Sequence, residues 1–236
     1  MLMRRAHAHA TCPCSCDVRA GWSGNTLVGT IPSSFYNLTE LEHLYLSNDR
    51  PGWSRLHGTV STEIGRLHKL KCLYLSHAGA LTGTLPTEIG SLTRLQGIYT
   101  RWTSLGGPLP DLSRLRNLSK LVIDAAPLGS CPPFCQSSFS GTLAPLAAAR
   151  LPFEHLDVAG NRFSGHFPTE LCTIHHCTAW GNHFTDPQRP RGCCDGVDAV
   201  GALNTVTERL EDDFSQGGNE CYEHAFPGRV IQPPLS

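Results

Sequence analysis

The sequence predicts an α/β repeat solenoid, in which short strands and turns stack into one elongated body. Three observations support this fold class: a leucine phrase that recurs along the chain, a glycine phrase that follows each copy of it, and a spacing near 24 residues between most copies. Such repetition is typical of folds in which each unit packs only on its neighbours.

The leucine phrase, Leu-x-x-Leu-x-x-Leu-x-Leu, occupies residues 38–46 and recurs unchanged at 67–75. It returns with substitutions at 92–100 and 115–123, and in shortened form at 153–158. Side chains alternate between the two faces of a strand, so the closing Leu-x-Leu predicts a short strand with one buried face. The i, i+3 spacing before it breaks that alternation, and the chain is expected to coil there while its leucines still point inward.

The glycine phrase runs from an apolar residue through x-Gly-x to a second apolar residue and usually a proline, as in Leu27–Pro32 and Leu81–Pro86. Glycine permits a tight bend, and proline fixes the extended segment that follows. Successive glycines of this phrase are 29, 25, 24, 34 and 24 residues apart. The unit is therefore about 24 residues long, and two copies carry insertions.

These phrases resemble the plant-type leucine-rich repeat, Leu-x-x-Leu-x-Leu-x-x-Asn-x-Leu-x-Gly-x-Ile-Pro, over roughly residues 20–185. The resemblance implies a right-handed superhelix of about seven coils, with a parallel concave sheet and an irregular convex side. It also implies that Asn25, Asn161 and Asn182 bridge backbone groups between coils. In the middle coils Asp49, Ala78, Thr103 and Ala126 replace this asparagine. In family terms the chain is similar to receptor-kinase ectodomains or to polygalacturonase-inhibitor-like proteins.

The sequence predicts three regions. Residues 1–19 form a cysteine-rich N-terminal segment, and residues 20–185 form the solenoid with insertions near 48–55 and 125–138. Residues 186–236 are expected to be a C-terminal cap with a short helix and a loose tail. Both insertions leave the chain just after a strand, so they are expected on one edge, where insertions often bind partners. Neutral drift of surface loops explains them equally well.

Eleven cysteines are typical of an oxidising compartment, and an extracellular or cell-surface location is favoured over a cytoplasmic one. Residues 1–5 are not followed by an apolar run, and no apolar stretch is long enough to span a bilayer, so neither a signal peptide nor a membrane span is predicted. The disulfide candidates are Cys131, Cys135, Cys172, Cys177, Cys193, Cys194 and Cys221.

Charge and motifs exclude several function classes. Nineteen Lys and Arg balance 20 Asp and Glu, so no basic field attracts nucleic acid. No nucleophile elbow, phosphate loop, His-Glu-x-x-His or kinase signature occurs, and neither an enzyme nor a cofactor is predicted. Two groups of His and Cys lack the paired spacing of a zinc module, so no metal is predicted, although a metal-associated scaffold stays an alternative. These groups are His7, His9, Cys12, Cys14 and Cys16, and Cys172, His175, His176, Cys177, Cys193 and Cys194.

The remaining prediction is a non-catalytic module that binds a protein or peptide, with a glycan as an alternative ligand, through its concave face and same-edge loops. Residues between the inward leucines point out of the sheet, and Tyr45, Tyr74 and Tyr99 fall in one column. Stacked tyrosines suit a recognition strip, but they also stabilise a sheet by cross-strand contact. An inhibitor of a secreted hydrolase is a further alternative. The predicted binding residues are His43, Tyr45, Ser47, Tyr74, Tyr99, Arg101, Lys120, Asp124, His155, Asp157, His176 and Trp180.

Overall fold

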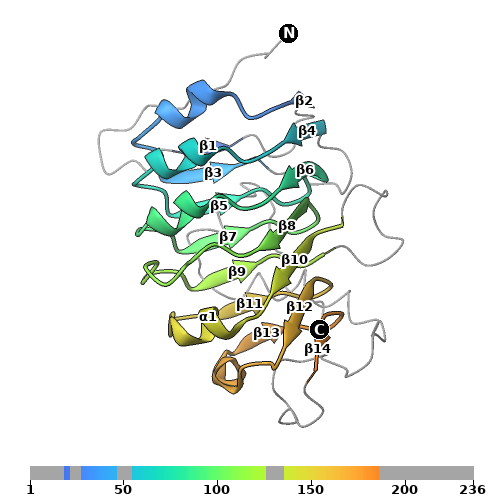
Figure 1. The fold of residues 1–236 in the computed structure, drawn as a ribbon. Helices are drawn as coiled ribbons and strands as arrows, with labels where there is room; N and C mark the ends of the chain where they lie inside the picture. The colour runs from blue at the N-terminus through green and yellow to red at the C-terminus, as the bar shows by residue number, and fades with distance from the viewer. Residues whose placement is uncertain (1–18, 22–27, 47–54, 126–135, 186–236) are drawn as a thin grey trace, which may run out of the picture.

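The computed structural model describes residues 19–21, 28–46, 55–125 and 136–185. These segments form a single stack of coils, which runs from blue to orange in Figure 1. Each coil adds one strand to each of two parallel sheets, so the α/β leucine-rich-repeat solenoid predicted from the sequence is confirmed.

One sheet contains the odd-numbered strands in the order β1-β3-β5-β7-β9-β11-β13, all parallel. The closing Leu-x-Leu of each leucine phrase lies in or beside these strands, as expected. We call the surface of this sheet that points away from the core the concave face. The strands are β1 (Arg19–Gly21), β3 (His43–Tyr45), β5 (Cys72–Tyr74), β7 (Gly97–Tyr99), β9 (Lys120–Val122), β11 (His155–Asp157) and β13 (His176–Thr178).

The even-numbered strands form a second parallel sheet, which adds regular structure that the sequence did not lead us to expect. The glycine phrase explains it, because its glycines have positive φ at one recurring place, from 76° at Gly107 to 110° at Gly29. The same bend in successive coils brings the preceding residues into register. The strands are β2 (Val28–Gly29), β4 (Arg55–Gly58), β6 (Ala80–Gly83), β8 (Ser104–Pro108), β10 (Ser138–Gly141), β12 (Arg162–Gly165) and β14 (His183–Phe184).

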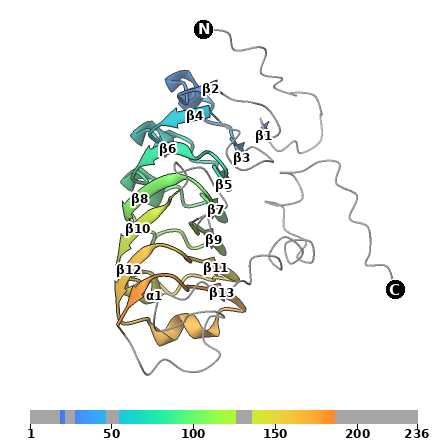
Figure 2. The ribbon, with the colours of Figure 1, turned by 90° about the vertical axis from the view of Figure 1, so that its right-hand side faces the viewer.

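Short helical turns complete the coils on the side away from the concave face (Figure 2). Most are single 3-10 turns, and the coil after the longer insertion carries a short α-helix with Pro145 in its first turn. The turns are η1 (Ser33–Asn37), η2 (Thr62–Arg66), η3 (Thr87–Ser91), α1 (Ala144–Ala148) and η4 (Thr169–Thr173).

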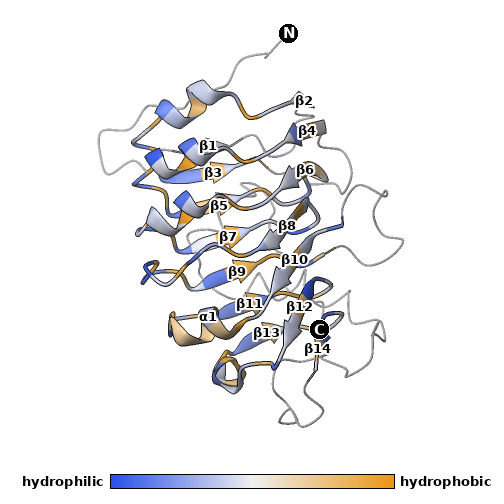
Figure 3. Cartoon of the chain, in the orientation of Figure 1, coloured by the Kyte–Doolittle hydropathy of each residue, from blue (hydrophilic) through white to orange (hydrophobic). Residues whose placement is uncertain are grey.

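The core is a column of leucines that runs through the stack. Leu67, Leu70, Leu73 and Leu75 of one leucine phrase are all fully buried, and the equivalent residues of the next coils lie beside them. Figure 3 shows these apolar positions recurring from coil to coil. Because a single coil leaves its leucines open above and below, the stability comes from stacking.

Asparagines bridge the last coils as the resemblance implies. The Asn161 amide donates to the carbonyl oxygens of Ile123 and Val158 at 2.9 and 3.1 Å, and its oxygen accepts from the Phe139 N–H at 3.0 Å. Asn182 repeats this arrangement one coil later, donating to Val158 and accepting from the Phe163 N–H. In a middle coil Thr103 takes over part of this role, since its hydroxyl donates to the Thr100 carbonyl and accepts from the Leu105 N–H.

Replacing Asn161 by Ala should lower the free energy of unfolding by about 3 kcal/mol, because the buried Phe139 N–H and Ile123 carbonyl lose their partner. Asn117 is the matched control, because it is exposed and its amide donates a hydrogen bond to the Thr93 carbonyl at 3.1 Å. Asn117→Ala should cost less than about 1 kcal/mol. Chemical denaturation of both variants checks this, and equal losses would show that the bridge is not the stabilising feature.

Several predicted features lie outside the described residues. They are most of the N-terminal segment, the greater part of both insertions, the C-terminal region, Asn25, Ser47, and the candidate disulfide residues Cys131, Cys135, Cys193, Cys194 and Cys221. Within the described segments, no helix has the length and apolar character needed to cross a membrane.

Candidate functional site

The centre of the concave face is a column of aromatic rings. Parallel pairing places Tyr45 opposite Tyr74, Tyr74 opposite Tyr99, and Tyr99 opposite Val122. The ring centroids of Tyr45 and Tyr74 are 6.0 Å apart, and those of Tyr74 and Tyr99 are 5.1 Å apart with the two ring planes inclined at 29°. The structure therefore brings the predicted tyrosines together as a continuous stack.

This column is far less accessible than an open recognition strip would be. Tyr45 is 2% exposed, Tyr74 9% and Tyr99 3%, and with Cys72 and Val122 they form a hydrophobic cluster separate from the core. We call these five residues the concave cluster. His43, beside Tyr45, is also buried, with its Nδ1 3.4 Å from the tyrosine hydroxyl.

Next to the tyrosines, three predicted residues form one buried charge network. The Nε atom of Arg101 lies 2.9 and 2.8 Å from the two carboxylate oxygens of Asp124. The Nη2 atom of Arg101 lies 3.8 Å from one carboxylate oxygen of Asp157. The other oxygen of Asp157 accepts a hydrogen bond from the Ala159 N–H at 3.2 Å. Two carboxyl groups thus share one guanidinium, and both aspartates are buried.

Burial and the charges of the neighbouring groups shift the pKa values of Asp124, Asp157 and Arg101. Burial, reinforced by the Asp157 carboxylate, raises the pKa of Asp124 to about 7 despite the contact with Arg101. Burial also raises the pKa of Asp157, and Arg101 opposes it. Burial by itself would lower the pKa of Arg101, but the two aspartates outweigh it and raise that pKa. Burial therefore favours the neutral form of both carboxyl groups, whereas the contact with Arg101 favours their ionised form.

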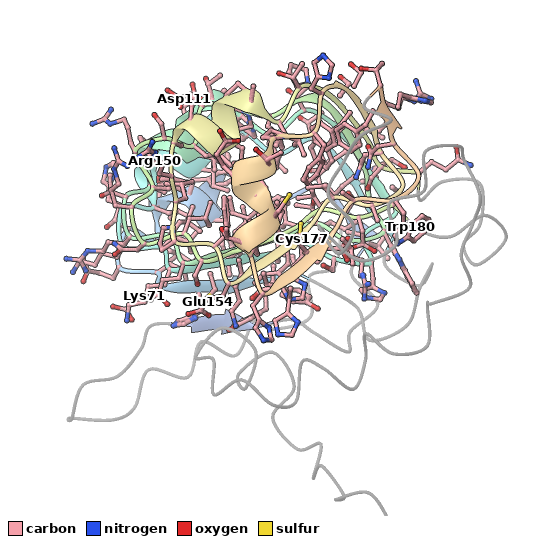
Figure 4. The ribbon with its side chains drawn as sticks, turned by 90° about the horizontal axis from the view of Figure 1, so that it is seen from below. Lys71, Asp111, Arg150, Glu154, Cys177 and Trp180 are labelled. Atoms are coloured by element: carbon pink, nitrogen blue, oxygen red, sulfur yellow. The ribbon has the colours of Figure 1, made fainter. Side chains whose placement is uncertain are left out.

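The lower concave face is polar and more open. Lys120, His155, His176 and Trp180 are all half-buried. The rings of His155 and His176 stack with centroids 5.6 Å apart, and burial lowers the pKa of Lys120. Figure 4 places Trp180 at the outer edge of the coil and Cys177 within it. These four residues form the accessible part of the predicted site, and we call them the lower concave patch.

A second aromatic pair, which was not predicted from the sequence, lies beside Arg101. The rings of His77 and Trp102 lie 4.8 Å apart, and the Arg101 guanidinium is 5.8 Å from the Trp102 ring. Both residues have left-handed backbone, with φ of 65° and 57°. The equivalent positions of later coils are Gly160 and Gly181, also at positive φ. A bulky residue where the repeat elsewhere uses glycine was the signal that could have identified this pair.

His77 is held neutral in this position. Burial, assisted by the Arg101 charge, lowers its pKa to about 4. Within the described part of the chain, the His77 Nδ1 and the Trp102 Nε1 are buried without a hydrogen-bond partner. The pair therefore adds two polar atoms to the edge of the concave face next to the charge network.

The described cysteines and histidines do not assemble a metal site, since no group of three His, Cys, Asp or Glu side chains in these segments has suitable geometry. Two predicted disulfide candidates are described: Cys172 lies in η4 and Cys177 in β13, and both pack against the core.

Comparison with known proteins agrees with this architecture. A family model described as Leucine Rich Repeat matches residues 153–174. No curated protein matches the chain.

Solved structures resemble the chain over about two thirds of its length. The structure of PEPR1 with AtPEP1 is 26% identical with a TM-score of 0.55, and covers 69% of this chain and 21% of its own. The structure of the Arabidopsis receptor kinase HAESA in complex with the peptide hormone IDA and the co-receptor SERK1 is 23% identical with a TM-score of 0.57, and the match covers 70% of this chain and 25% of that one. This second likeness shows the fold alone. The chain spans about a quarter or less of the length of these proteins.

Proposed function

Because the chain is a leucine-rich-repeat protein of the plant type, we propose that it is a non-catalytic module that binds a peptide or a protein segment through its concave face. The observation that carries this proposal is the lower concave patch, where an ammonium group from β9, imidazole groups from β11 and β13, and an indole from the coil after β13 lie on the same face. The likeness to PEPR1, solved with AtPEP1, supports a peptide or protein ligand.

The chemistry of the patch suits an extended chain. His155 and His176 occupy the same column of neighbouring strands, and Lys120 continues that column on β9. Parallel strands lie about 4.8 Å apart, so three neighbouring strands span roughly 10 Å, and an extended peptide with a rise of roughly 3.3 Å per residue crosses them with about three residues. Trp180 supplies a large apolar surface with a polar N–H at the edge, a combination that is common in binding hot spots.

A random linear-peptide library selected against the immobilised full chain tests this proposal. His155→Ala and Trp180→Ala should each weaken binding of the selected peptides about tenfold or more, equivalent to about 1.4 kcal/mol. His183→Ala is the matched control, because this histidine is exposed on β14 of the opposite sheet and its loss should leave binding unchanged. Thermal unfolding of each variant confirms that the fold is intact. Equal binding by all three variants would refute the proposal.

We also infer that Cys172 and Cys177 are joined by a disulfide. The two residues belong to consecutive elements of the last described coil, they are five positions apart, and both face the core. Such a bond would place the folded chain in an oxidising compartment, where a secreted peptide or protein would meet it. Mass spectrometry of an unreduced digest tests this. Separate peptides that contain Cys172 and Cys177 as thiols would contradict it.

A further inference from the structure

Two exposed asparagines of the described coils lie in the sequence pattern that accepts an N-linked glycan. The pattern is Asn-x-Ser or Asn-x-Thr, with any residue except proline in the middle. It occurs at Asn37-Leu-Thr39 and at Asn117-Leu-Ser119. Asn37 ends η1 and Asn117 lies shortly before β9, and both are exposed. Both acceptor side chains therefore lie at the surface, where a bulky hydrophilic group fits without displacing the core.

We propose that Asn37 and Asn117 each carry an N-linked oligosaccharide. In this modification the Nδ2 atom of the asparagine attacks the anomeric carbon of a lipid-diphosphate-linked oligosaccharide. A bond forms between this nitrogen and the sugar, the sugar's bond to the diphosphate breaks, and one amide proton is released. The lipid diphosphate leaves, and the modified nitrogen keeps one hydrogen. The inference does not rest on the proposed function, because it concerns a different part of the surface.

The repeat itself does not produce these two patterns. Asn37 directly precedes the first leucine of its phrase, whereas Asn117 directly precedes the second leucine of a later copy. In the copy at 67–75, the same two places are held by Arg66 and Lys69. Other polar side chains therefore serve equally well at these places. The fold does not require an asparagine that is followed two residues later by a hydroxyl group.

The local structure has room for both sugars. The Asn117 amide donates to the Thr93 carbonyl at 3.1 Å, and a glycosylated amide still has one N–H with which to keep this hydrogen bond. The link to the neighbouring coil and the sugar are therefore compatible. Asn37 is followed by three exposed residues (38–40), so the chain beside it is also open.

Both positions lie on the stretch of a coil that leads into a concave strand. Asn117 is three residues before Lys120, which begins β9, and Asn37 is six residues before His43, which begins β3. The strands of this sheet are parallel, so Trp180, which follows β13, lies at the opposite edge. The glycans would exclude a bulky partner from the edge where the strands begin and leave the Trp180 edge open.

Peptide mapping of the full chain tests the proposal. The chain is directed into the secretory pathway of yeast, recovered from cells and medium together, and treated with peptide N-glycosidase in heavy-oxygen water before digestion. Release of a glycan leaves an aspartate that carries one heavy oxygen, and most copies of positions 37 and 117 should carry this label. Asn161 and Asn182 lack the pattern and are the internal controls, which should remain asparagine. Asparagine left unmodified at 37 or 117 in most chains would overturn the proposal.

Variants that keep the asparagine show whether the pattern is what directs the modification. Thr39→Ala and Ser119→Ala should each lower the intact mass by that of one oligosaccharide, whereas Thr39→Ser should keep both glycans. Retention of both glycans in the alanine variants, or loss of one in Thr39→Ser, would overturn the proposal. Chains retained in the cells are included, so the result does not depend on the folding of a variant. No ligand is involved, and failure therefore leaves the test of peptide binding intact.

Discussion

Replacing Arg101 by Met should lower the free energy of unfolding by about 3 to 5 kcal/mol, because it leaves two buried carboxyl groups without their cation. Arg101 is the only basic side chain recorded in contact with both Asp124 and Asp157 within the described residues. Methionine retains much of the side-chain volume, so the loss reports on charge. Urea denaturation at pH 7 measures it.

Arg94→Met is the matched control for this measurement. Arg94 is exposed in the turn before β7, and no ion pair is recorded for it in the described chain. Its replacement should change stability by less than about 0.5 kcal/mol. A loss below about 1 kcal/mol for Arg101→Met would show that the guanidinium does not stabilise the two aspartates, which would contradict a buried charge network.

The stability difference between Asp124→Asn and the wild-type chain should depend on pH. The pKa of Asp124 rises from 3.8 to about 7 on folding, so between these values the folded chain binds more protons than the unfolded chain. Wild-type stability from this group is fully present below about pH 4 and is lost as the pH rises through 7. The asparagine variant has no such loss. Its stability relative to wild type should therefore increase from pH 4 to pH 8, by on the order of 3 kcal/mol.

Only the difference in stability between the Asp124→Asn variant and the wild-type chain reports on the pKa of Asp124. His77 contributes the opposite slope, because its pKa falls from 6.5 to about 4 on folding and its contribution is lost as the pH decreases through that range. It is present in both proteins and largely cancels. Denaturation curves at several pH values provide the comparison. A pH-independent difference, or one that favours wild type at high pH, would contradict the raised pKa.

The repeat made the sheet and core predictable from the sequence. Leu73 and Leu75 had to be buried because they alternate with an outward residue, and the same register placed Tyr45, Tyr74 and Tyr99 in one column. Arg101 and Asp124 were expected on the same face for this reason, and they form an ion pair. Periodicity fixes which face a residue occupies, and neighbours in one column must meet.

Accessibility and backbone strain could not be derived in the same way. The tyrosine column was predicted to be a recognition surface, but its rings are buried, because burial depends on contacts that a repeat register does not contain. The second sheet depends on six glycine bends with the same geometry, and the sequence showed only that bends were possible. The His77 and Trp102 pair depends on positive φ at non-glycine residues, which propensities argue against.

The hydrogen-exchange footprint of a selected peptide on the full chain tests the central claim, that this solenoid recognises its ligand through the concave face. Exchange should slow on binding in residues 120–124, 155–159 and 176–180, which include the strands β9, β11 and β13. The turns η2, η3 and η4 on the opposite side should exchange as in the free chain. Protection confined to those turns, with no change in the three concave strands, would contradict the claim.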